Sequence, residues 1–372
     1  MQEKNNSKRV LVDGSRLIIE SLARSGADAF IGYPITPANL LYFYAARRMD
    51  LMLSAPDEIT TLQWMTGLAA TGKLPVTATS FPGFALMLES INMAYMMELP
   101  MVIVLVQRLG PATGTATCGA QGDLLLLRGM ISGGHPIPVL APATYEDCWE
   151  LSAKASAIAV KLRTPVVLLT SKEEVMTQRS FNPGHLPAIA AVERPVYDKD
   201  CTYRSYRAAG MVPDFLPVGN DKHQVRLNAS THDDAGILQH SSLEALANTR
   251  RLEEKIRNGM QEFVFYDYDS ESGANRLVVA YGISASAARE AVRSLRSQGE
   301  KVSLLVPKTL LPMPADIKRI MDKYNKVVIA EESMNNQFGE VIYGQDKPGH
   351  IRFAGGLGKM ITPEQIIREV QS

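Results

Sequence analysis

The sequence predicts an α/β protein with two parallel-sheet units joined by a long irregular segment. Apolar strand-like runs alternate with helical periods through the first half of the chain. A second set of the same kind begins at Arg276, and the stretch between them, 180–270, is rich in Pro, Tyr, Asp, His and Asn. Continuous apolar strands between helices are typical of parallel sheets buried on both faces.

In the first unit we expect helices and strands to alternate strictly. The expected strands are 29–33, 51–54, 75–80, 101–107, 136–140 and 165–170. The expected helices are 14–26, 39–48, 57–71, 84–97, 121–131 and 144–163. Asp57 takes the N-cap position of the third helix. Ligands of open parallel sheets bind outside the carboxyl ends of strands, so the loops after strands are the candidate sites.

In the second unit the strong patterns are fewer. The expected strands are 277–282, 301–307 and 326–332, and the expected helices are 284–298, 314–323 and 362–370. The irregular segment ends in a charged helix over 243–258, and its length is typical of a linker, an arm or a binding loop. We therefore divide the chain into 1–185, an irregular linker or arm at 186–272, and 273–372.

Composition excludes several functional classes. Among 372 residues, 39 Lys and Arg balance 39 Asp and Glu, which argues against nucleic acid as the main partner and suits a chain covered by other subunits. No apolar run approaches the ~18 residues of a membrane span, and the polar N-terminus predicts no signal peptide. The three cysteines and six histidines match no metal or redox spacing, which predicts a cytoplasmic protein without a metal site of its own.

Two of the candidate loops present a polar side chain just after a strand. Thr36 stands between Pro34 and Pro37, which either present its hydroxyl to a ligand or simply form a rigid turn. Glu58 opens a helix, where the macrodipole stabilises a carboxylate. A capping role explains an acidic residue at that position equally well, so spacing alone does not assign a function to it.

The other two loops carry a Pro-Gly turn and a cation. Phe81, Pro82 and Gly83 precede a helix and let a ligand approach its N-terminus. Arg108 ends a strand, where it either captures a carboxylate with two hydrogen bonds or is a solvated basic residue. Neither GxGxxG after a strand nor GxxxxGK[ST] occurs, so a nucleotide-binding Rossmann oxidoreductase lacks its main support.

Taken in order, these segments resemble the alpha subunit of 2-oxoacid:ferredoxin oxidoreductases, most nearly the 2-oxoglutarate type. The segments are GYPITPA (32–38), DEITTLQWMTGLAATG (57–72), TATSFPGFALMLESI (77–91), VIVLVQRLGPATG (102–114), QGDLLLLRG (121–129), VVAYGISASAAREAV (278–292) and GKMITPEQIIREV (358–370). The resemblance implies a pyrimidine-type domain that binds thiamine diphosphate, followed by a transketolase C-terminal-like domain. Both are α/β domains, and the first has a parallel sheet with helices on both faces.

The resemblance also implies roles for the matched residues. Glu58 would be catalytic, because a hydrogen bond to the aminopyrimidine ring of thiamine diphosphate favours the tautomer that removes the reactive proton. Thr36 and Arg108 would bind the 2-oxoacid, Thr36 through the oxo group or the carboxylate and Arg108 through the carboxylate. Cys118 would lie beside the substrate. The residues next to the cofactor would be Pro34, Ile35, Glu58, Phe81, Pro82 and Gly83.

Four departures from the family pattern bear on the substrate. The family usually has Gly at Phe81 and Leu109, Ser at Ala38, and a TKTEQGD-like run in which Lys occupies the position of Cys118. A lysine there is suited to a second substrate carboxylate, and this chain has lost it. We therefore expect a monocarboxylic 2-oxoacid with a branched or aromatic side chain, such as phenylglyoxylate.

The family reaction converts a 2-oxoacid, coenzyme A and oxidised ferredoxin into acyl-CoA, carbon dioxide and reduced ferredoxin. The GDG…N pattern that holds the diphosphate is absent here, as is any cluster motif. A beta subunit would therefore supply the diphosphate and Mg²⁺ sites, and [4Fe-4S] clusters would lie on partner subunits, including a gamma chain and a ferredoxin-like chain. A non-catalytic assembly or regulatory subunit is the alternative, favoured by Phe81 and the altered loop at 118–120.

Overall fold

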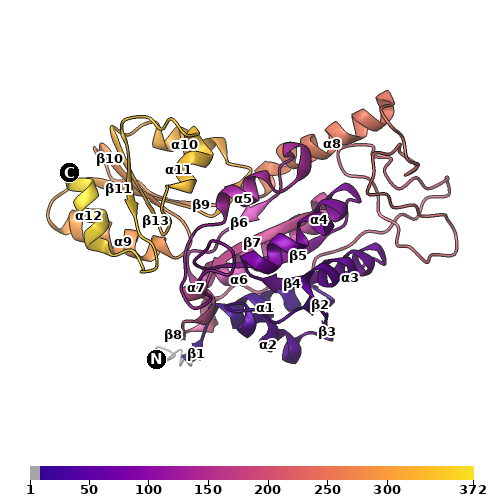
Figure 1. The fold of residues 1–372 in the computed structure, drawn as a ribbon, viewed down its shortest axis with the longest axis horizontal. Helices are drawn as coiled ribbons and strands as arrows, with labels where there is room; N and C mark the ends of the chain where they lie inside the picture. The colour runs from indigo at the N-terminus through magenta and orange to yellow at the C-terminus, as the bar shows by residue number, and fades with distance from the viewer. Residues whose placement is uncertain (1–8) are drawn as a thin grey trace, which may run out of the picture.

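The computed structural model describes residues 9–372 and contains two α/β units, with a long arm extending from the first (Figure 1). The first unit is built on a seven-stranded sheet with the order β12-β6-β7-β5-β4-β2-β3. Its strands are β2 (Ala29–Gly32), β3 (Leu51–Ser54), β4 (Pro75–Thr79), β5 (Met101–Gln107), β6 (Val139–Leu140), β7 (Pro165–Ser171) and β12 (Thr309–Leu311). All pairs are parallel except β12 with β6, so the predicted α/β fold class is confirmed.

Helices cover both faces of this sheet (Figure 1). They are α1 (Gly14–Arg24), α2 (Asn39–Arg48), α3 (Glu58–Ala70), α4 (Phe81–Met96), α5 (Leu124–Gly129), α6 (Tyr145–Leu162) and α7 (Lys172–Met176). Helix α1 packs against α2 and α6, and α3 packs against α4. Strands β1 (Val10–Val12) and β8 (Arg179–Phe181) form a small antiparallel ribbon beside them.

The second unit is a five-stranded sheet with the order β14-β13-β10-β11-β9. Its strands are β9 (Tyr266–Asp269), β10 (Arg276–Ala280), β11 (Val302–Pro307), β13 (Lys326–Glu331) and β14 (Ile351–Gly355). Its helices are α9 (Ser284–Ser297), α10 (Ala315–Met321), α11 (Gln337–Tyr343) and α12 (Pro363–Gln371). Helix α12 is capped by Thr362, and Gln365 completes the capping box.

The arm runs from the end of β8 to α8 (Leu243–Gly259). Short 3-10 turns lie at Pro183–His185 and, after α8, at Met260–Glu262; a third, Ser132–Gly134, follows α5. The arm is fixed by side chains rather than by a sheet: His232 is buried against Tyr206, with ring centroids 3.8 Å apart. The adjacent Asp233 accepts backbone hydrogen bonds from Ala235 and Ile237, which closes a tight turn.

Two strands pair outside the part of the chain to which we assigned them from the sequence. Strand β9 lies within the expected arm yet pairs with β11, and β12 lies within the expected second unit yet joins the first sheet. Two helices also differ from expectation. Helix α4 begins at Phe81, three residues early, because Ser80 adopts the extended backbone of an N-cap. Helix α5 is shorter than 121–131, because Gln121 is bonded to the second unit. No helix in 9–372 has the length and apolarity needed to cross a membrane.

Candidate functional site

The predicted site residues gather at one edge of the seven-stranded sheet. Thr36 follows β2, Glu58 follows β3, Gly83 lies just after β4, and Arg108 follows β5. These four strands are neighbours in the order β5-β4-β2-β3 and run parallel, so their carboxyl ends meet at the same edge. The side chains form two groups, one around Glu58 and one around Arg108.

The first group places the Glu58 carboxylate against the first turn of α4. Glu58 is the first residue of α3, next to the N-cap Asp57, and only 7% of it is exposed. A Cβ atom at Gly83 would lie 2.5 Å from Glu58 Oε1 and would also overlap Thr79 Oγ1. Gly83 therefore leaves the space that the carboxylate occupies. Within residues 9–372 no hydrogen-bond donor reaches this carboxylate, so it is held in place by the helix terminus and by packing.

Two buried hydroxyl groups lie in the turn that precedes Gly83. Thr79 and Ser80 are fully buried where β4 ends and α4 begins, and the Ser80 hydroxyl has no partner among the described residues. Buried polar atoms without partners cost free energy, so their presence indicates a ligand or a partner chain that completes them. Ile35, Phe81 and Pro82, which precede or open the neighbouring helices, are partly buried, and Pro34 is exposed.

The second group is centred on Arg108, which is 5% exposed rather than solvated. Its Nη1 donates a 2.5 Å hydrogen bond to the backbone carbonyl of Thr36, and its buried Nε has no partner among residues 9–372. Burial lowers the pKa of Arg108. Burial also raises the pKa of Asp123 to about 7, although the charge of Arg108 opposes this shift. Arg108 therefore has donor capacity to spare for a carboxylate.

The loop after β5 folds back over Arg108. The Leu109 N–H donates to the Cys118 carbonyl at 2.8 Å, which places Cys118 next to Leu109, and Thr115 donates to the Leu109 carbonyl. Cys118 is a free thiol that is partly buried. Gly119 lies so close to the carboxylate of Glu173 that a Cβ atom there would overlap it. The backbone of Cys118 thus lies next to Leu109, the residue after Arg108, and the place of its thiol beside the substrate stays a prediction.

One part of the site was missed by sequence reasoning. Gln121 is fully buried and joins the two units: its side chain donates to the Tyr281 carbonyl at 2.9 Å and accepts from Ser284 and from the Glu332 backbone. Buried carboxyls from both units surround this junction, at Asp123, Glu174, Glu331 and Glu332. The sequence signal for three of them was a pair of acidic residues near the end of a buried strand, in SKEE after β7 and in AEES at the end of β13.

Comparison with known protein families assigns both units. Residues 20–252 match the family described as pyruvate flavodoxin/ferredoxin oxidoreductase, thiamine diphosphate-binding, and residues 274–366 match core domain II of pyruvate:ferredoxin oxidoreductase. The first match alone covers more than half of the chain. This chain belongs to the 2-oxoacid:ferredoxin oxidoreductase family, as an alpha-type subunit.

Its relatives in the family differ in their substrates. The chain is 30% identical to the 2-oxoglutarate synthase subunit KorA of Archaeoglobus fulgidus, over 97% of this chain and 98% of the relative. It is 32% identical to the ketoisovalerate oxidoreductase subunit VorB of Methanothermobacter thermautotrophicus, over 87% of this chain and 86% of the relative. The alpha-type subunit is thus similar to relatives named for a dicarboxylic and for a branched monocarboxylic 2-oxoacid.

Solved structures support the same fold. The chain matches 2-oxoglutarate:ferredoxin oxidoreductase from Magnetococcus marinus, a structure with 2-oxoglutarate, coenzyme A and succinyl-CoA bound, with a TM-score of 0.92 and 26% identity. The match covers 99% of this chain and 66% of that longer chain, just under two thirds. A split-gene transketolase matches with a TM-score of 0.55 and 14% identity, which shows a shared fold alone.

Proposed function

We propose that this alpha-type subunit acts within a complex that oxidatively decarboxylates a 2-oxoacid to acyl-CoA and carbon dioxide, using thiamine diphosphate. The observation that carries the proposal is the buried Glu58 carboxylate, held against Gly83 with no donor from residues 9–372. Such a carboxylate has its acceptor capacity available for a ligand. The buried Ser80 hydroxyl, which has no partner among the described residues, stands in the turn before Gly83 and also supports a ligand near this helix terminus.

These residues fit the aminopyrimidine end of thiamine diphosphate. Glu58 would accept a hydrogen bond from the ring, and Ile35, Phe81 and Pro82 would supply an apolar wall. When bound, the cofactor supplies the nucleophilic carbon and the electron sink for decarboxylation. The chain's own contribution is to hold the ring in place and to offer the Glu58 carboxylate as a hydrogen-bond acceptor. That hydrogen bond would favour one tautomer of the ring.

Arg108 and Thr36 would bind the substrate. The Nε of Arg108 is buried without a partner among the described residues and would donate to the substrate carboxylate. Thr36 is held beside it through its backbone carbonyl, which leaves its hydroxyl for the oxo group. Because equal binding of the ground state and the transition state does not speed chemistry, this contact positions the acid and does not itself accelerate loss of carbon dioxide.

The substrate we propose is a monocarboxylic 2-oxoacid with a branched or aromatic side chain. Leu109 and Cys118 adjoin Arg108, and neither offers a cation for a second carboxylate. The 32% identity with a ketoisovalerate oxidoreductase subunit supports this class. The similarity to 2-oxoglutarate synthase subunits supports a dicarboxylic substrate instead. The choice between the two classes therefore rests on the lack of a cation at Leu109 and Cys118.

The complex would require partner chains for the rest of its machinery. We propose a beta subunit with the diphosphate and Mg²⁺ sites, a gamma subunit, [4Fe-4S] clusters on the partners, and ferredoxin or another acceptor outside the complex. Within residues 9–372 no group of three or more His, Cys, Asp or Glu side chains is placed to hold a metal ion. The three cysteines are unpaired thiols, which suits a reducing cytoplasmic location.

Calorimetry of the isolated chain tests this division of labour. Because only the aminopyrimidine end would be bound by this subunit, we expect weak or undetectable binding of thiamine diphosphate. Tight stoichiometric binding by the isolated chain would contradict the need for a beta subunit.

A substrate panel tests the function itself. The complex should be purified with its partner chains and assayed with coenzyme A, a viologen acceptor, and 2-oxoglutarate, ketoisovalerate, phenylglyoxylate and pyruvate in turn. We expect coenzyme A-dependent reduction, fastest with ketoisovalerate or phenylglyoxylate. Turnover of 2-oxoglutarate at an equal or higher rate would overturn the proposed substrate class, and no reduction with any acid would favour the non-catalytic alternative.

A further inference from the structure

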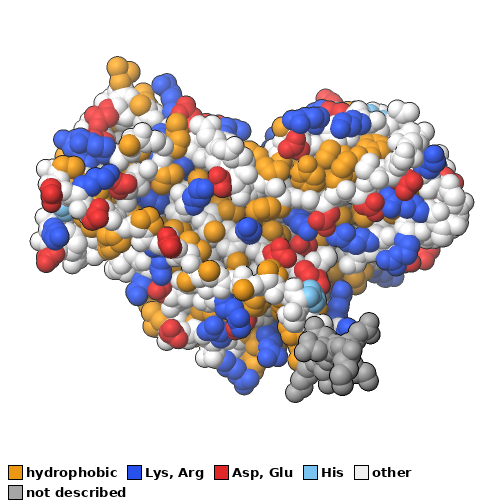
Figure 2. Space-filling view, turned by 180° about the vertical axis from the view of Figure 1, so that it is seen from behind, with side chains coloured by type: hydrophobic (Ala, Val, Ile, Leu, Met, Phe, Trp, Pro, Cys, Tyr) orange, Lys and Arg blue, Asp and Glu red, His pale blue; other side chains and the backbone are white. Residues whose placement is uncertain are grey.

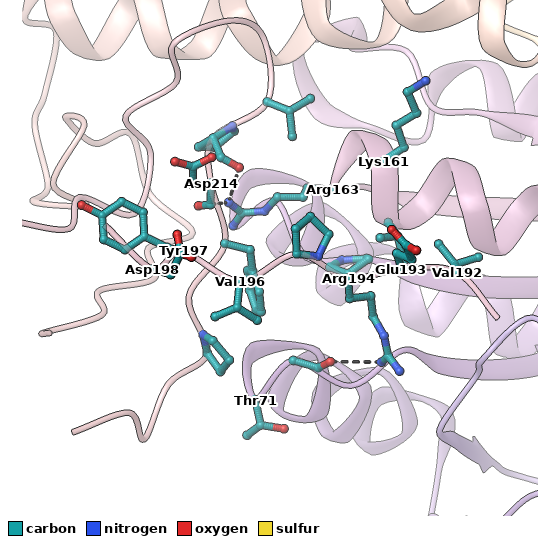
Figure 3. A pocket seen from close by; sticks show the side chains of 18 of the residues that line it. Thr71, Lys161, Arg163, Val192, Glu193, Arg194, Val196, Tyr197, Asp198 and Asp214 are labelled. Atoms are coloured by element: carbon teal, nitrogen blue, oxygen red, sulfur yellow. Dashed lines mark hydrogen bonds between the residues drawn. The ribbon is translucent and has the colours of Figure 1, made fainter. Parts of the chain in front are cut away.

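A cavity of about 820 Å³ lies between the arm and the first unit (Figure 3). Its floor includes Gly72, Pro100 and Arg163, which stand just before β4, β5 and β7. These positions are the amino ends of the parallel strands, whereas Glu58 and Arg108 stand at the opposite edge of the sheet. The cavity is therefore separate from the site proposed for the 2-oxoacid and thiamine diphosphate.

The walls of the cavity are largely apolar, and most of its charged residues are already paired. Val196, Phe215 and Pro217 of the arm face Pro100 and Val160 of the first unit. Lys199 pairs with Asp214 at 2.7 Å, Lys161 with Glu262 at 2.9 Å, and Arg194 with Asp28. These cations therefore have local carboxylate counter-ions, whereas Arg163 has none among residues 9–372.

Arg163 differs from the other cations of the cavity, because it is 4% exposed and makes no ion pair with any residue of 9–372. Its Nε donates to the Glu98 carbonyl at 3.1 Å, and its Nη1 donates to the carbonyls of Pro213 and Asp214. Its Nη2 is buried with no partner among the described residues. Figure 3 shows Arg163 at the centre of the cavity, with Val196 beside it and the Lys161 ammonium further away.

The buried charges behind Arg163 are unbalanced. Glu98 is fully buried, and its carboxylate pairs with Lys255 at 2.7 Å and with Arg251. The Glu98 carboxylate thus pairs with two cations, Arg251 and Lys255, whereas Arg163 contacts only the backbone carbonyl of Glu98. The Arg163 charge is compensated only by three backbone carbonyls and by the Phe215 ring, whose centroid is 5.0 Å away, so an anion in the cavity next to Arg163 would be favoured.

The charges at the rim of the cavity and the apolar walls limit which anions the cavity can bind. Glu193 and Asp198 line the opening and are exposed, so they disfavour ligands that carry several negative charges. The apolar walls favour a ligand with a hydrocarbon body, and the volume is in the ordinary range for small-molecule sites. We propose that this cavity binds a small apolar monocarboxylate, whose carboxylate reaches Arg163 Nη2 after a small displacement of the arm.

Calorimetric titration of the full chain tests the proposal. Octanoate is the probe, octanamide is its neutral counterpart, and inorganic phosphate is an anion without an apolar body. We expect one octanoate per chain, with octanamide and phosphate at least about ten-fold weaker. Arg108→Gln should leave octanoate binding unchanged, because that arginine serves the other edge of the sheet.

Variants of the arm distinguish this cavity from nonspecific binding without disturbing the buried network. Val196 lines the cavity and is 51% exposed, so Val196→Asp adds a repelling charge at little cost in stability. For Val196→Asp we expect at least a ten-fold loss of octanoate affinity, and for Val196→Asn a smaller loss. Val218→Asp should leave the affinity unchanged, because Val218 is 36% exposed and lies outside the cavity. Absence of octanoate binding, equal binding of octanamide, loss of binding in Arg108→Gln, or equal effects of the two aspartates would each overturn the proposal.

Discussion

Gly83 is the residue on which the geometry around Glu58 depends most. A helix interior normally favours Ala over Gly by about 1 kcal/mol, so a glycine in the first turn of α4 requires a local reason. The reason is space, because a Cβ atom there would lie 2.5 Å from Glu58 Oε1. Nothing at Gly83 requires a left-handed backbone, so the constraint comes from the side chain opposite.

Gly83→Ala should therefore move Glu58 and reduce turnover of the assembled complex. A displacement of about 1 Å at a reacting centre costs about 10²-fold in rate, which sets the expected size of the loss. Gly67→Ala is the matched control, because Gly67 lies in the interior of α3 and a Cβ atom added there would have no neighbouring atom within 4 Å. The control should keep full activity and gain about 0.5–1 kcal/mol of stability. Equal activity of the two variants would contradict the assigned geometry.

At the scale of residues, the sequence could predict which site residues lie together, but not the distant partners of a buried side chain. Thr36, Glu58, Gly83 and Arg108 meet because strands that run parallel end at one edge, and motif order sufficed to expect it. Gln121 was different, because its partners Tyr281, Ser284 and Glu332 lie at least 160 residues away along the chain. No local pattern records which distant backbone groups a buried amide will bind.

At the scale of elements, a buried carboxylate, Glu98, anchors the charged face of α8 to the first unit, beside the apolar contacts of Leu252 and Ile256. Burial opposes the ionised form, yet Lys255 and Arg251 lower the pKa of Glu98 to about 2, so this carboxylate is charged at neutral pH. Burial lowers the pKa of Lys255 to about 8, against the attraction of Glu98. The pair fixes α8 to the segment between α4 and β5. It thereby anchors the end of the arm, which leads into α8.

Glu98→Gln should release this helix. Removing the carboxylate leaves the buried Lys255 and the partly buried Arg251 without their counter-ion, which should cost about 3–5 kcal/mol in the free energy of unfolding measured with urea. Glu253→Gln is the control, because that carboxylate forms an exposed pair with Arg257 along the same helix and should contribute less than about 1 kcal/mol. Similar losses for the two variants would show that the buried cluster does not anchor α8.

Long elements and the four-residue edge strand β3 could be predicted from the sequence, whereas the shorter edge strand β12 could not. The apolar runs of β5, β7, β11 and β13 were evident because each is buried along its length. Strand β12 has three residues, and its partner β6 has only two and lies about 170 residues earlier in the chain. A strand of that length carries no periodicity, so its existence depends on how the two units pack.

At the scale of the whole molecule, the two units meet across buried acids. Burial raises the pKa of Asp123, Glu331 and Glu332 to about 7 and that of Glu174 to about 8. Free carboxyls in an unfolded chain titrate near pH 4, so the folded state retains these protons at higher pH than the unfolded state does. The junction is therefore most stable while these groups are protonated.

The free energy of unfolding should fall as pH rises from 6.5 to 8. In that window the unfolded state has already released the protons that the folded state still binds, so each group lowers stability by up to about 1.4 kcal/mol per pH unit. The loss is complete once the pH exceeds the folded pKa values. Urea unfolding at several pH values measures it, and Glu332→Gln should flatten the dependence whereas the exposed Glu364→Gln should not. A stability that rises over this window would contradict the buried acids at the junction.

The most direct test of the central claim is the turnover of the assembled complex carrying Glu58→Gln. Glutamine keeps the shape of the side chain but cannot act as a proton acceptor for the cofactor ring. With the preferred 2-oxoacid, coenzyme A and a viologen acceptor, we predict a loss of at least about 10²-fold, the usual size of such a contribution. Glu290→Gln, on the exposed face of α9, should retain full activity. Unchanged turnover of Glu58→Gln would contradict a catalytic role for this subunit.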